Sequence, residues 1–225
     1  GFDGDGDRIG IIDAKGRQVP GDLLTAFRAQ DVAARHPGAP ILLDAKSSES
    51  ALRLIESSGA SAQIWKTGHS HMKKRMKELG APLAGEMSGH IFIGDGYLGF
   101  DDAIYAGARI VTQMTRGGQS ITAFMDSLPP QNATPELRID CPDTEKFATM
   151  DRIREHVFAS HNPDDVNVID GVRVRASRGW WLIRASNTEA ALVARAEAED
   201  EAALDGLLGD IEAALGAAGL AWVRP

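Results

Sequence analysis

The sequence predicts an α/β protein: a mixed α/β/α domain with a largely parallel sheet, followed by a smaller α+β domain of the order β-α-β-β-β-α. Two observations support this fold class. Short apolar runs alternate with longer amphipathic runs as far as residue 128, which is typical of parallel strands joined by helices. A segment with three prolines in eight residues, 128–135, then separates this pattern from a different one.

The first part of the chain alternates strands and helices. A helix over 22–34 is indicated by Leu23, Leu24 and Phe27, which share one face, and Pro37-Gly38 stops it. The expected elements, in order, are a buried strand over 9–13, a helix over 22–34, a strand over 40–44, a helix over 49–58 capped by Ser47 or Ser48, a strand over 61–65, a basic helix over 69–79, a strand over 82–84, and helices over 103–115 and 120–128.

The second part predicts the smaller α+β domain. Its final helix carries the clearest signal, because apolar residues recur there at helical spacing. Those residues are Leu204, Leu207, Leu208, Ile211 and Leu215. The expected elements are a strand over 136–140, a helix over 143–160, strands over 166–174, 180–184 and 191–196, and a helix over 201–217.

Composition argues against two classes of partner. The 225 residues are 43% hydrophobic and 25% charged, as in globular proteins with a sizeable core. A formal net charge of −8 argues against nucleic acid and against a membrane surface, although a local basic pocket can still bind a small anion. Cys141 is the only cysteine, and no apolar run reaches the roughly 18 residues of a membrane span, so we expect a cytoplasmic protein.

An acidic, glycine-rich loop lies at the start of the sequence. Asp3, Asp5 and Asp7 alternate with glycines, and Arg8 follows at once. Alternating carboxylates can converge on one hard cation such as Mg²⁺ or Ca²⁺, and the adjacent arginine implies a bound anion, most simply a phosphate. The spacing is not that of an EF-hand, because Arg8 and Ala14 stand where its glycine and glutamate would be. A solvated acidic turn is the alternative.

Basic side chains follow two neighbouring strands. Lys46 comes just after the strand over 40–44, and Lys66 and His69 follow the strand over 61–65. Ligands of open α/β sheets bind at the carboxyl ends of the strands, so these residues are candidates for contact with an anionic ligand. The alternative is that the lysines are simply solvated.

A third polar cluster lies in the segment 85–90. Glu86, Ser88 and His90 alternate there, so in an extended chain they project to one side. A carboxylate, a hydroxyl and an imidazole suit a polyhydroxylated ligand and proton transfer near neutral pH. The alternative is a polar loop at the end of a strand.

The fourth cluster connects two strands expected in the second domain. Arg184, Ser186, Asn187 and Thr188 offer a guanidinium, two hydroxyls and an amide, and together they fit one phosphate group. The alternative is an ordinary hairpin turn, which the Ser-Asn pair favours by itself.

In their order along the chain, these clusters resemble the α-D-phosphohexomutase superfamily, most closely bacterial phosphomannomutase/phosphoglucomutase. The resemblance covers essentially the whole chain. The loop 3–8 is similar to the family's Mg²⁺-binding loop, 85–90 to its sugar-binding loop and 184–188 to its phosphate-binding loop. Lys46 and the segment 66–70 are similar to active-site segments of the family's third domain.

The family enzyme has four domains, so the resemblance implies a domain map. Residues 1–17 correspond to the tail of domain 2, 18–128 to domain 3, 129–134 to a linker and 135–225 to domain 4. The implied partners are hexose phosphates and the missing N-terminal domains of the same enzyme, which carry a phosphoserine outside this chain. The look-alike Ser-His-Asn-Pro at 160–163 follows a predicted helix, and we interpret it as a helix end and turn.

The resemblance implies an isomerase that moves a phosphoryl group between O1 and O6 of mannose or glucose phosphate. It implies Mg²⁺ as cofactor and glucose 1,6-bisphosphate or mannose 1,6-bisphosphate as intermediate and activator. The implied metal ligands are Asp3, Asp5 and Asp7. The implied catalytic residues are His90 as general acid/base, with Arg8, Lys46 and His69. The implied substrate-binding residues are Lys46, Lys66, His69, Glu86, Ser88, His90, Arg184, Ser186, Asn187 and Thr188.

Three other functions stay open at this point: a non-catalytic phosphosugar-binding module, a phosphoglucosamine mutase, and a hard-cation-binding protein unrelated to sugars. Met87 resembles the mannose/glucose enzymes, whereas Ala190 departs from the proline that family members often have two residues after the threonine of the phosphate loop. We expect the chain alone to be inactive. We also expect the loop 3–8 to be frayed or displaced, because chain ends fray unless they are tied down.

Overall fold

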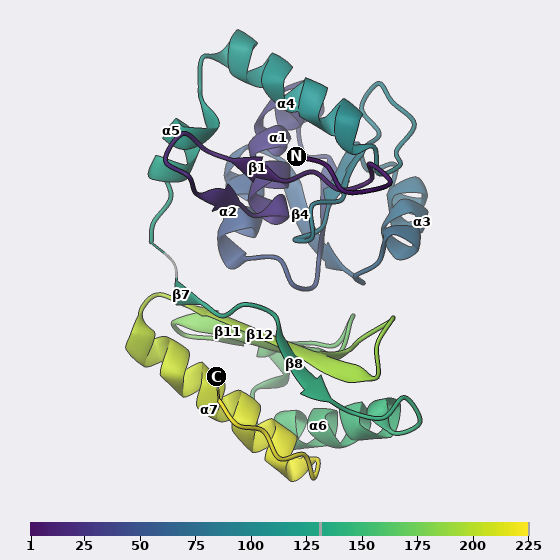
Figure 1. Ribbon diagram of the computed structural model, residues 1–225, viewed down its shortest axis with the longest axis vertical. Coiled ribbons are helices and arrows are strands. Elements are labelled where there is room, and N and C mark those ends of the chain that lie inside the picture. Colours follow the sequence, from purple (N-terminus) through teal and green to yellow (C-terminus); the bar gives the residue numbers. More distant parts are fainter. Residues whose placement is uncertain (131, 225) are drawn as a thin grey trace. The chain divides into compact units, whose positions relative to one another are not determined.

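The computed structural model describes residues 1–130 and 132–224, which form two compact units (Figure 1). The first unit is Gly1–Pro129, and the second begins at Pro130. Gln131, in the expected linker, and Pro225, at the end of the expected last domain, lie outside the described residues. The assignment of segments to domains 2, 3 and 4 stays a prediction.

The first unit contains a mixed sheet with helices on both faces. Its elements are β1 (Ile11–Ile12), β2 (Gln18–Val19), α1 (Gly21–Arg35), β3 (Pro40–Asp44), α2 (Glu49–Ser57), β4 (Ser61–Trp65), α3 (His69–Leu79), β5 (Leu83–Gly85), β6 (Ile91–Ile93), α4 (Ala103–Gly117) and α5 (Ile121–Asp126). The sheet order is β4-β3-β5-β6. β3 pairs in parallel with β4 and β5, and β6 is antiparallel to β5. The predicted α/β fold with a largely parallel sheet is confirmed.

Alternation along β3 explains the layers. Ile41 and Leu43 belong to the core that contains residues of α1, α2 and α4, whereas Leu42 packs with the methionines of α3. Successive strand residues point to opposite faces, so an apolar strand must be covered on both sides. All three side chains are fully buried.

The residues before α1 do not form the buried strand expected over 9–13. Within the expected range, only Ile11 and Ile12 form a strand, β1, and this strand pairs with β2 alone. Ile12 is 71% exposed. Ile9 is buried instead, because Phe2 forms an antiparallel bridge with it and its amide donates to the Gly89 carbonyl at 3.1 Å. A two-residue strand at the surface leaves every second side chain facing solvent.

The short strand β6 was not predicted. It returns antiparallel to β5, with Gly85 opposite Ile91. The connection between the two strands is therefore a tight hairpin, and the extended geometry expected over 85–90 is wrong. Gly89 has a φ of +100°, and a Cβ there would lie 2.5 Å from the carbonyl oxygen of Ile9. Only glycine fits this turn without strain.

The second unit has an antiparallel sheet. Its elements are β7 (Asn132–Ala133), β8 (Leu137–Asp140), α6 (Lys146–Ser160), η1 (Pro163–Asp165), β9 (Val166–Asn167), β10 (Val172–Ala176), β11 (Gly179–Ala185), β12 (Ala191–Ala198) and α7 (Glu201–Ala217). The strand order is β7-β12-β11-β10-β9, and β8 also pairs with β12. The expected order β-α-β-β-β-α is present as β8-α6-β10-β11-β12-α7. β7 lies within the segment expected as a linker, where it pairs with β12.

Both long helices of the second unit lie on one face of its sheet (Figure 1). Neighbouring tryptophans of β11 mark the two faces. Trp181 packs into the core with α6 and α7, whereas Trp180 lies beneath Arg173, whose guanidinium carbon is 3.6 Å from the ring centroid. The second face of the sheet is thus covered by charged side chains stacked on an aromatic ring.

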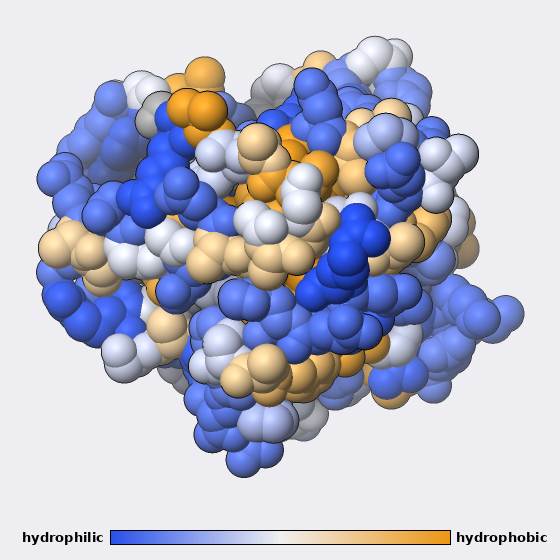
Figure 2. Space-filling view, turned by 90° about the horizontal axis from the view of Figure 1, so that it is seen from below, coloured by the Kyte–Doolittle hydropathy of each residue, from blue (hydrophilic) through white to orange (hydrophobic). Residues whose placement is uncertain are grey.

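The surface is mixed in character. The face drawn in Figure 2 is a mosaic in which hydrophilic residues predominate and hydrophobic residues lie among them. Within the described residues, no helix is both long and apolar enough to cross a membrane.

Candidate active site

Polar residues meet at the carboxyl ends of β3, β4 and β5. Lys46 follows β3, His69 begins α3 after β4, and Glu86 follows β5. Because the three strands are parallel, their carboxyl ends lie at one edge of the sheet. Lys46 is only 7% exposed, so it is not a solvated lysine. Lys66 is exposed, and among the contacts of the described residues none joins it to this cluster.

Glu86, Ser88 and His90 form one hydrogen-bonded group. The Ser88 hydroxyl oxygen lies 3.2 Å from Glu86 Oε2 and 2.9 Å from His90 Nδ1. His90 Nδ1 is itself 3.3 Å from Glu86 Oε2. The three side chains therefore meet as predicted, but the hairpin turn brings them together rather than alternation along a strand.

Glu86 is held in its ionised form although it is only 3% exposed. Burial alone raises the pKa of Glu86, but hydrogen bonds from His90, from the Gly68 amide and from Ser88 outweigh it and lower the pKa below its ordinary value. The Gly68 amide donates to Oε1 at 2.9 Å. A buried carboxylate with these donors is rigidly oriented.

His90 lies between two carboxylates. Its Nδ1 faces Glu86, and its Nε2 is 3.3 Å from Asp7 Oδ2. Burial alone lowers the pKa of His90, but the hydrogen bond to Glu86 and the charges of Glu86, Asp7 and Asp101 outweigh it and raise the pKa above its ordinary value. Protonation is thus favoured more strongly than in an ordinary histidine, which suits a proton donor.

The three carboxylates of the first cluster converge. One oxygen from each of Asp3, Asp5 and Asp7 lies within 4.8 Å of the others. Arg8 Nε is 2.5 Å from Asp3 Oδ2, and this hydrogen bond lowers the pKa of Asp3 to about 2. An all-carboxylate set of this size fits a hard cation such as Mg²⁺.

The loop that carries these carboxylates is tied down at both ends. The N-terminal amine of Gly1 donates to the Gly10 carbonyl at 2.8 Å. Arg8 forms an antiparallel bridge with His90. The expectation that the loop is frayed or displaced is therefore wrong, because its backbone pairs with the β5–β6 hairpin.

Asp101 is a site residue that the sequence did not reveal. Together with Asp7 and His90 it forms a second group of possible metal ligands within 4.8 Å. Its carboxylate also pairs with Lys73 at 2.9 Å and faces His69 Nδ1 at 3.5 Å. A mixed set of nitrogen and oxygen ligands suits Mg²⁺ less well than the three carboxylates do.

Asp44 lies two residues before the candidate Lys46 in the sequence, but no role was predicted for it. It is fully buried at the end of β3, where burial raises its pKa against the attraction of Lys46. Its Oδ1 accepts hydrogen bonds from the Ser47 hydroxyl at 2.7 Å and the Met87 amide at 3.1 Å. Its Oδ2 accepts one from the Thr67 hydroxyl at 3.3 Å. One carboxylate thus holds the segments that follow β3, β4 and β5.

The remaining candidates lie on the β11–β12 hairpin of the second unit. Arg184 ends up within β11, and the loop 186–190 connects to β12. Arg184 and Ser186 are buried, whereas Asn187 and Thr188 are exposed. The structure therefore contains the hairpin turn that was the alternative interpretation. The hydrogen-bond donors of the four candidate residues lie on this hairpin.

Arg184 is oriented by Asp170, which the sequence analysis did not single out. Its Nε lies 2.8 Å from Asp170 Oδ2, while its buried Nη2 has no hydrogen-bond partner among the described residues. Gly171 permits this approach: its φ is +80°, and a Cβ there would lie 2.6 Å from Arg184 Cα. A fixed guanidinium with an unused donor suits a phosphate oxygen.

Ser160 is the last residue of α6. Its hydroxyl donates to the His156 carbonyl at 2.8 Å, as is common in a final helical turn. The interpretation of this Ser-His-Asn-Pro segment as a helix end is confirmed.

Two family models match the chain. One describes the α/β/α domain III of phosphoglucomutase/phosphomannomutase and matches residues 20–131. The other describes the C-terminal domain of the same proteins and matches residues 136–225. The chain belongs to the phosphoglucomutase/phosphomannomutase family. The resemblance stated from the four clusters is thereby confirmed.

Two relatives of this chain carry mutase names. The phosphomannomutase/phosphoglucomutase of Pseudomonas putida is 45% identical over 203 residues, covering 90% of this chain and 43% of the relative. The phosphoglucomutase of Neisseria gonorrhoeae is 39% identical over 207 residues, covering 91% and 44%. The chain therefore spans less than half the length of these relatives.

Solved structures agree with the fold. A phosphoglucomutase/phosphomannomutase family protein from Burkholderia thailandensis has a TM-score of 0.87 at 39% identity, covering 97% of this chain and 46% of that one. The N-acetylphosphoglucosamine mutase of Aspergillus fumigatus, solved with GlcNAc-6P and magnesium, has a TM-score of 0.64 at 18% identity, covering 97% and 48%. The second likeness supports the shared fold alone.

Proposed function

We propose that the protein containing this chain is a phosphohexomutase that transfers a phosphoryl group between O1 and O6 of glucose or mannose phosphate through a 1,6-bisphosphate. The observation that carries the proposal is the junction of two clusters at His90, whose ring nitrogens lie against Asp7 and Glu86. The relatives named phosphomannomutase/phosphoglucomutase support the same reaction.

Asp3, Asp5 and Asp7 are the residues that would hold Mg²⁺. When bound, Mg²⁺ supplies positive charge against a transferring phosphoryl group. Arg8 adds a guanidinium beside this cluster, and it can exchange its contact with Asp3 for a phosphate oxygen.

Glu86 and Ser88 bind hydroxyl groups of the sugar, and His90 is the general acid/base. In the first transfer His90 takes the proton of the sugar hydroxyl that attacks the phosphoserine, and the serine oxygen leaves phosphorus. In the return transfer the serine oxygen attacks the other phosphoryl group and the protonated His90 gives its proton to the sugar oxygen that leaves, so the proton count balances over the two steps. Lys46, His69 and the exposed Lys66 supply positive charge for the substrate's phosphates.

In the second unit, Arg184, Ser186, Asn187 and Thr188 bind the phosphate group that does not react. The unused Nη2 donor of Arg184 supports this role, as do the exposed amide and hydroxyl beside it. Ser186 contributes mainly by shaping the loop, because its hydroxyl accepts the Glu189 amide at 3.1 Å. Such charge-assisted contacts fix orientation for a reaction that depends on positioning.

The phosphoserine lies outside this chain, in the N-terminal domains of the same enzyme, so these 225 residues bind phosphosugar without turning it over. Glucose 1,6-bisphosphate or mannose 1,6-bisphosphate serves as intermediate and activator in the whole enzyme. The buried free thiol of Cys141 suits the reducing cytoplasm, where we place the protein.

A coupled mutase assay tests the proposal. The whole enzyme and the 225-residue chain are each supplied with Mg²⁺, trace glucose 1,6-bisphosphate and either glucose 1-phosphate or mannose 1-phosphate. We expect turnover by the whole enzyme only. Turnover by the chain alone would refute the external phosphoserine, and turnover of glucosamine 1-phosphate alone would assign a phosphoglucosamine mutase.

Calorimetry on the chain tests the binding roles separately. We expect heat from glucose 1-phosphate that is reduced in Glu86→Gln. Tight binding of Ca²⁺ with no heat from any hexose phosphate would favour a cation-binding protein instead.

A further inference from the structure

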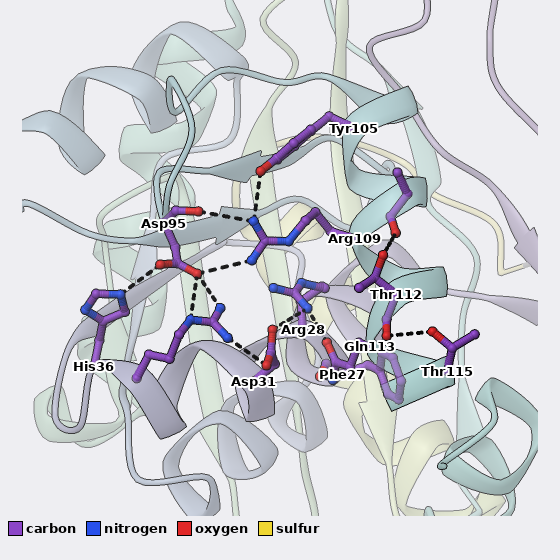
Figure 3. Close-up of polar contacts among 12 residues, drawn as sticks. Phe27, Arg28, Asp31, His36, Asp95, Tyr105, Arg109, Thr112, Gln113 and Thr115 are labelled. Carbon is purple, nitrogen blue, oxygen red and sulfur yellow. Dashed lines mark hydrogen bonds and ion pairs between the residues drawn. The ribbon is translucent and has the colours of Figure 1, made fainter. Parts of the chain in front are cut away.

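A cationic pocket lies between the later half of α1 and α4, and nothing in the proposed reaction uses it. The pocket has a volume of about 360 Å³, which falls at the lower end of small-molecule sites. Figure 3 shows the polar side chains in and around it. The lining residues that matter to the argument are Asp31, Arg35, Arg109, Thr112, Gln113 and Arg116.

This pocket is separate from the candidate active site. α1 begins at Gly21, where a Cβ would lie 2.3 Å from the backbone oxygen of Glu86. The first turn of α1 therefore contacts the loop 85–90. The pocket instead contacts α1 around Asp31. Ten residues of helix separate the two points, or about 15 Å along the axis.

Positive charge exceeds negative charge at the pocket. Asp95 is already shared, because its Oδ2 accepts from Arg35 Nε at 3.1 Å and Arg109 Nη2 at 3.3 Å, and its Oδ1 lies 2.9 Å from His36 Nε2. These partners oppose the effect of burial and lower the pKa of Asp95 to about 2. The cations of the cluster are Arg28, Arg35, Arg109 and Arg116, against the two carboxylates of Asp31 and Asp95. The surplus contrasts with the overall negative charge of the chain.

Arg28 contacts two residues that line the pocket. Its side chain is fully buried, and its Nη1 donates to the pocket residues Asp31, at 2.9 Å, and Gln113. Its Nε and Nη2 have no hydrogen-bond partner among the described residues. Burial lowers its pKa despite the attraction of Asp31, and repulsion from Arg109 and Arg35 adds to the effect.

Unsatisfied buried donors on a charged group are costly, so the surroundings of Arg28 favour a further negative charge nearby. In Figure 3 the guanidinium groups of Arg28 and Arg109 turn toward the same space beside Asp31 and Asp95. Several guanidinium groups around one space are the arrangement that binds phosphate oxygens in a forked geometry.

We propose that the α1–α4 pocket binds the phosphate group of a small molecule. A phosphate dianion offsets the charge of Arg35, Arg109 and Arg116, the three arginines that line the pocket. The hydroxyl of Thr112 and the amide of Gln113 line the same pocket and suit the polar remainder of a phosphorylated ligand. The source is either free phosphate or a phosphate ester, and the two differ in whether that remainder adds affinity.

Amide NMR on the isotope-labelled chain tests this site. Inorganic phosphate, and in a second arm glucose 6-phosphate, is titrated at about 150 mM salt, where weak surface pairing is screened. We expect saturable shifts in amides of α1 and α4 around Asp31 and Arg116. Tighter binding of the ester would support an ester ligand, and equal binding would support free phosphate; both outcomes support the site. Shifts confined to the strand ends and the 186–190 loop would overturn it.

Matched variants complete the test. Arg116→Gln removes an exposed pocket cation from the last turn of α4 and should weaken phosphate binding about tenfold, the value of one charge-assisted hydrogen bond. Arg53→Gln, an exposed arginine on α2, is the control and should bind as the unchanged chain does. Arg28→Lys should also weaken binding, and its amide spectrum shows whether it folds. Equal affinities of Arg116→Gln and Arg53→Gln would contradict the proposal.

Discussion

His90 and Glu86 stabilise each other only while the imidazole is protonated and the carboxyl group is ionised. The raised pKa of His90 makes its contribution complete below the unfolded-state value of about 6.5, and the contribution is lost as the pH rises through the folded-state pKa. The lowered pKa of Glu86 makes its contribution complete above about 4.3, and this is lost as the pH falls through the folded-state pKa. The pair therefore adds most stability between about pH 4.3 and 6.5.

We predict that Glu86→Gln costs roughly 1 kcal/mol more unfolding free energy at about pH 5.5 than at about pH 8.5. The glutamine keeps an acceptor for Ser88 but removes the charge that the imidazolium needs. Urea unfolding at the two pH values measures the difference. Glu56→Gln, an exposed site on α2, is the control and should show no such dependence. An equal cost of Glu86→Gln at both pH values would contradict the prediction.

At the scale of elements, the β5–β6 hairpin positions the loop 3–8, which carries the three aspartates. Gly89 accepts the amide of Ile9 at 3.1 Å, and no space remains there for a side chain. Gly96 offers a matched control, because its φ is also positive, at +69°, while a Cβ there would meet nothing within 4 Å. Comparing the two glycines separates the cost of the backbone conformation from that of the close approach.

We predict that Gly96→Ala lowers the free energy of unfolding by about 1 kcal/mol and Gly89→Ala by about 2–3 kcal/mol. Denaturant unfolding measures both values. The amide signals of the loop 3–8 should broaden or shift in Gly89→Ala only, since that loop is held by this hairpin. Equal costs for the two variants would show that contact with Ile9 contributes nothing.

The same scale separates elements that could be predicted from those that could not. The start of α2 follows from a local signal, because the Ser48 hydroxyl accepts the Ala51 amide at 3.1 Å and caps the helix. The helix over 201–217 was likewise predicted from periodicity and is confirmed as α7. β6 and β7 were missed because strands of two or three residues depend on distant partners rather than on local propensity.

At the scale of the whole chain, each unit has a hydrophobic core of its own. The core around β3 is built from residues up to 128, and the core around Trp181 is built from residue 137 onward. Units with separate cores are expected to fold independently. The chain should therefore not behave as one cooperative unit.

We predict that residues 130–225 produced alone keep the amide spectrum that they have in the whole chain. Unfolding of the whole chain followed by amides of the second unit should then differ from unfolding followed by amides of the first unit. An unfolded spectrum for the isolated segment would contradict this prediction. Coincident transitions for the two probes would do so independently.

The sequence by itself determined the fold class, the family and the residue types gathered in the four clusters. These depend on periodicity and on spacings of a few residues, which local chemistry controls. The tertiary structure alone decided that Arg8 pairs with His90 and that Asp44 holds three loops. It also decided that Asp170 orients Arg184 and that Arg28 is buried with donors to spare. Each of these depends on contacts between residues far apart in the chain, which only packing around a common core brings together.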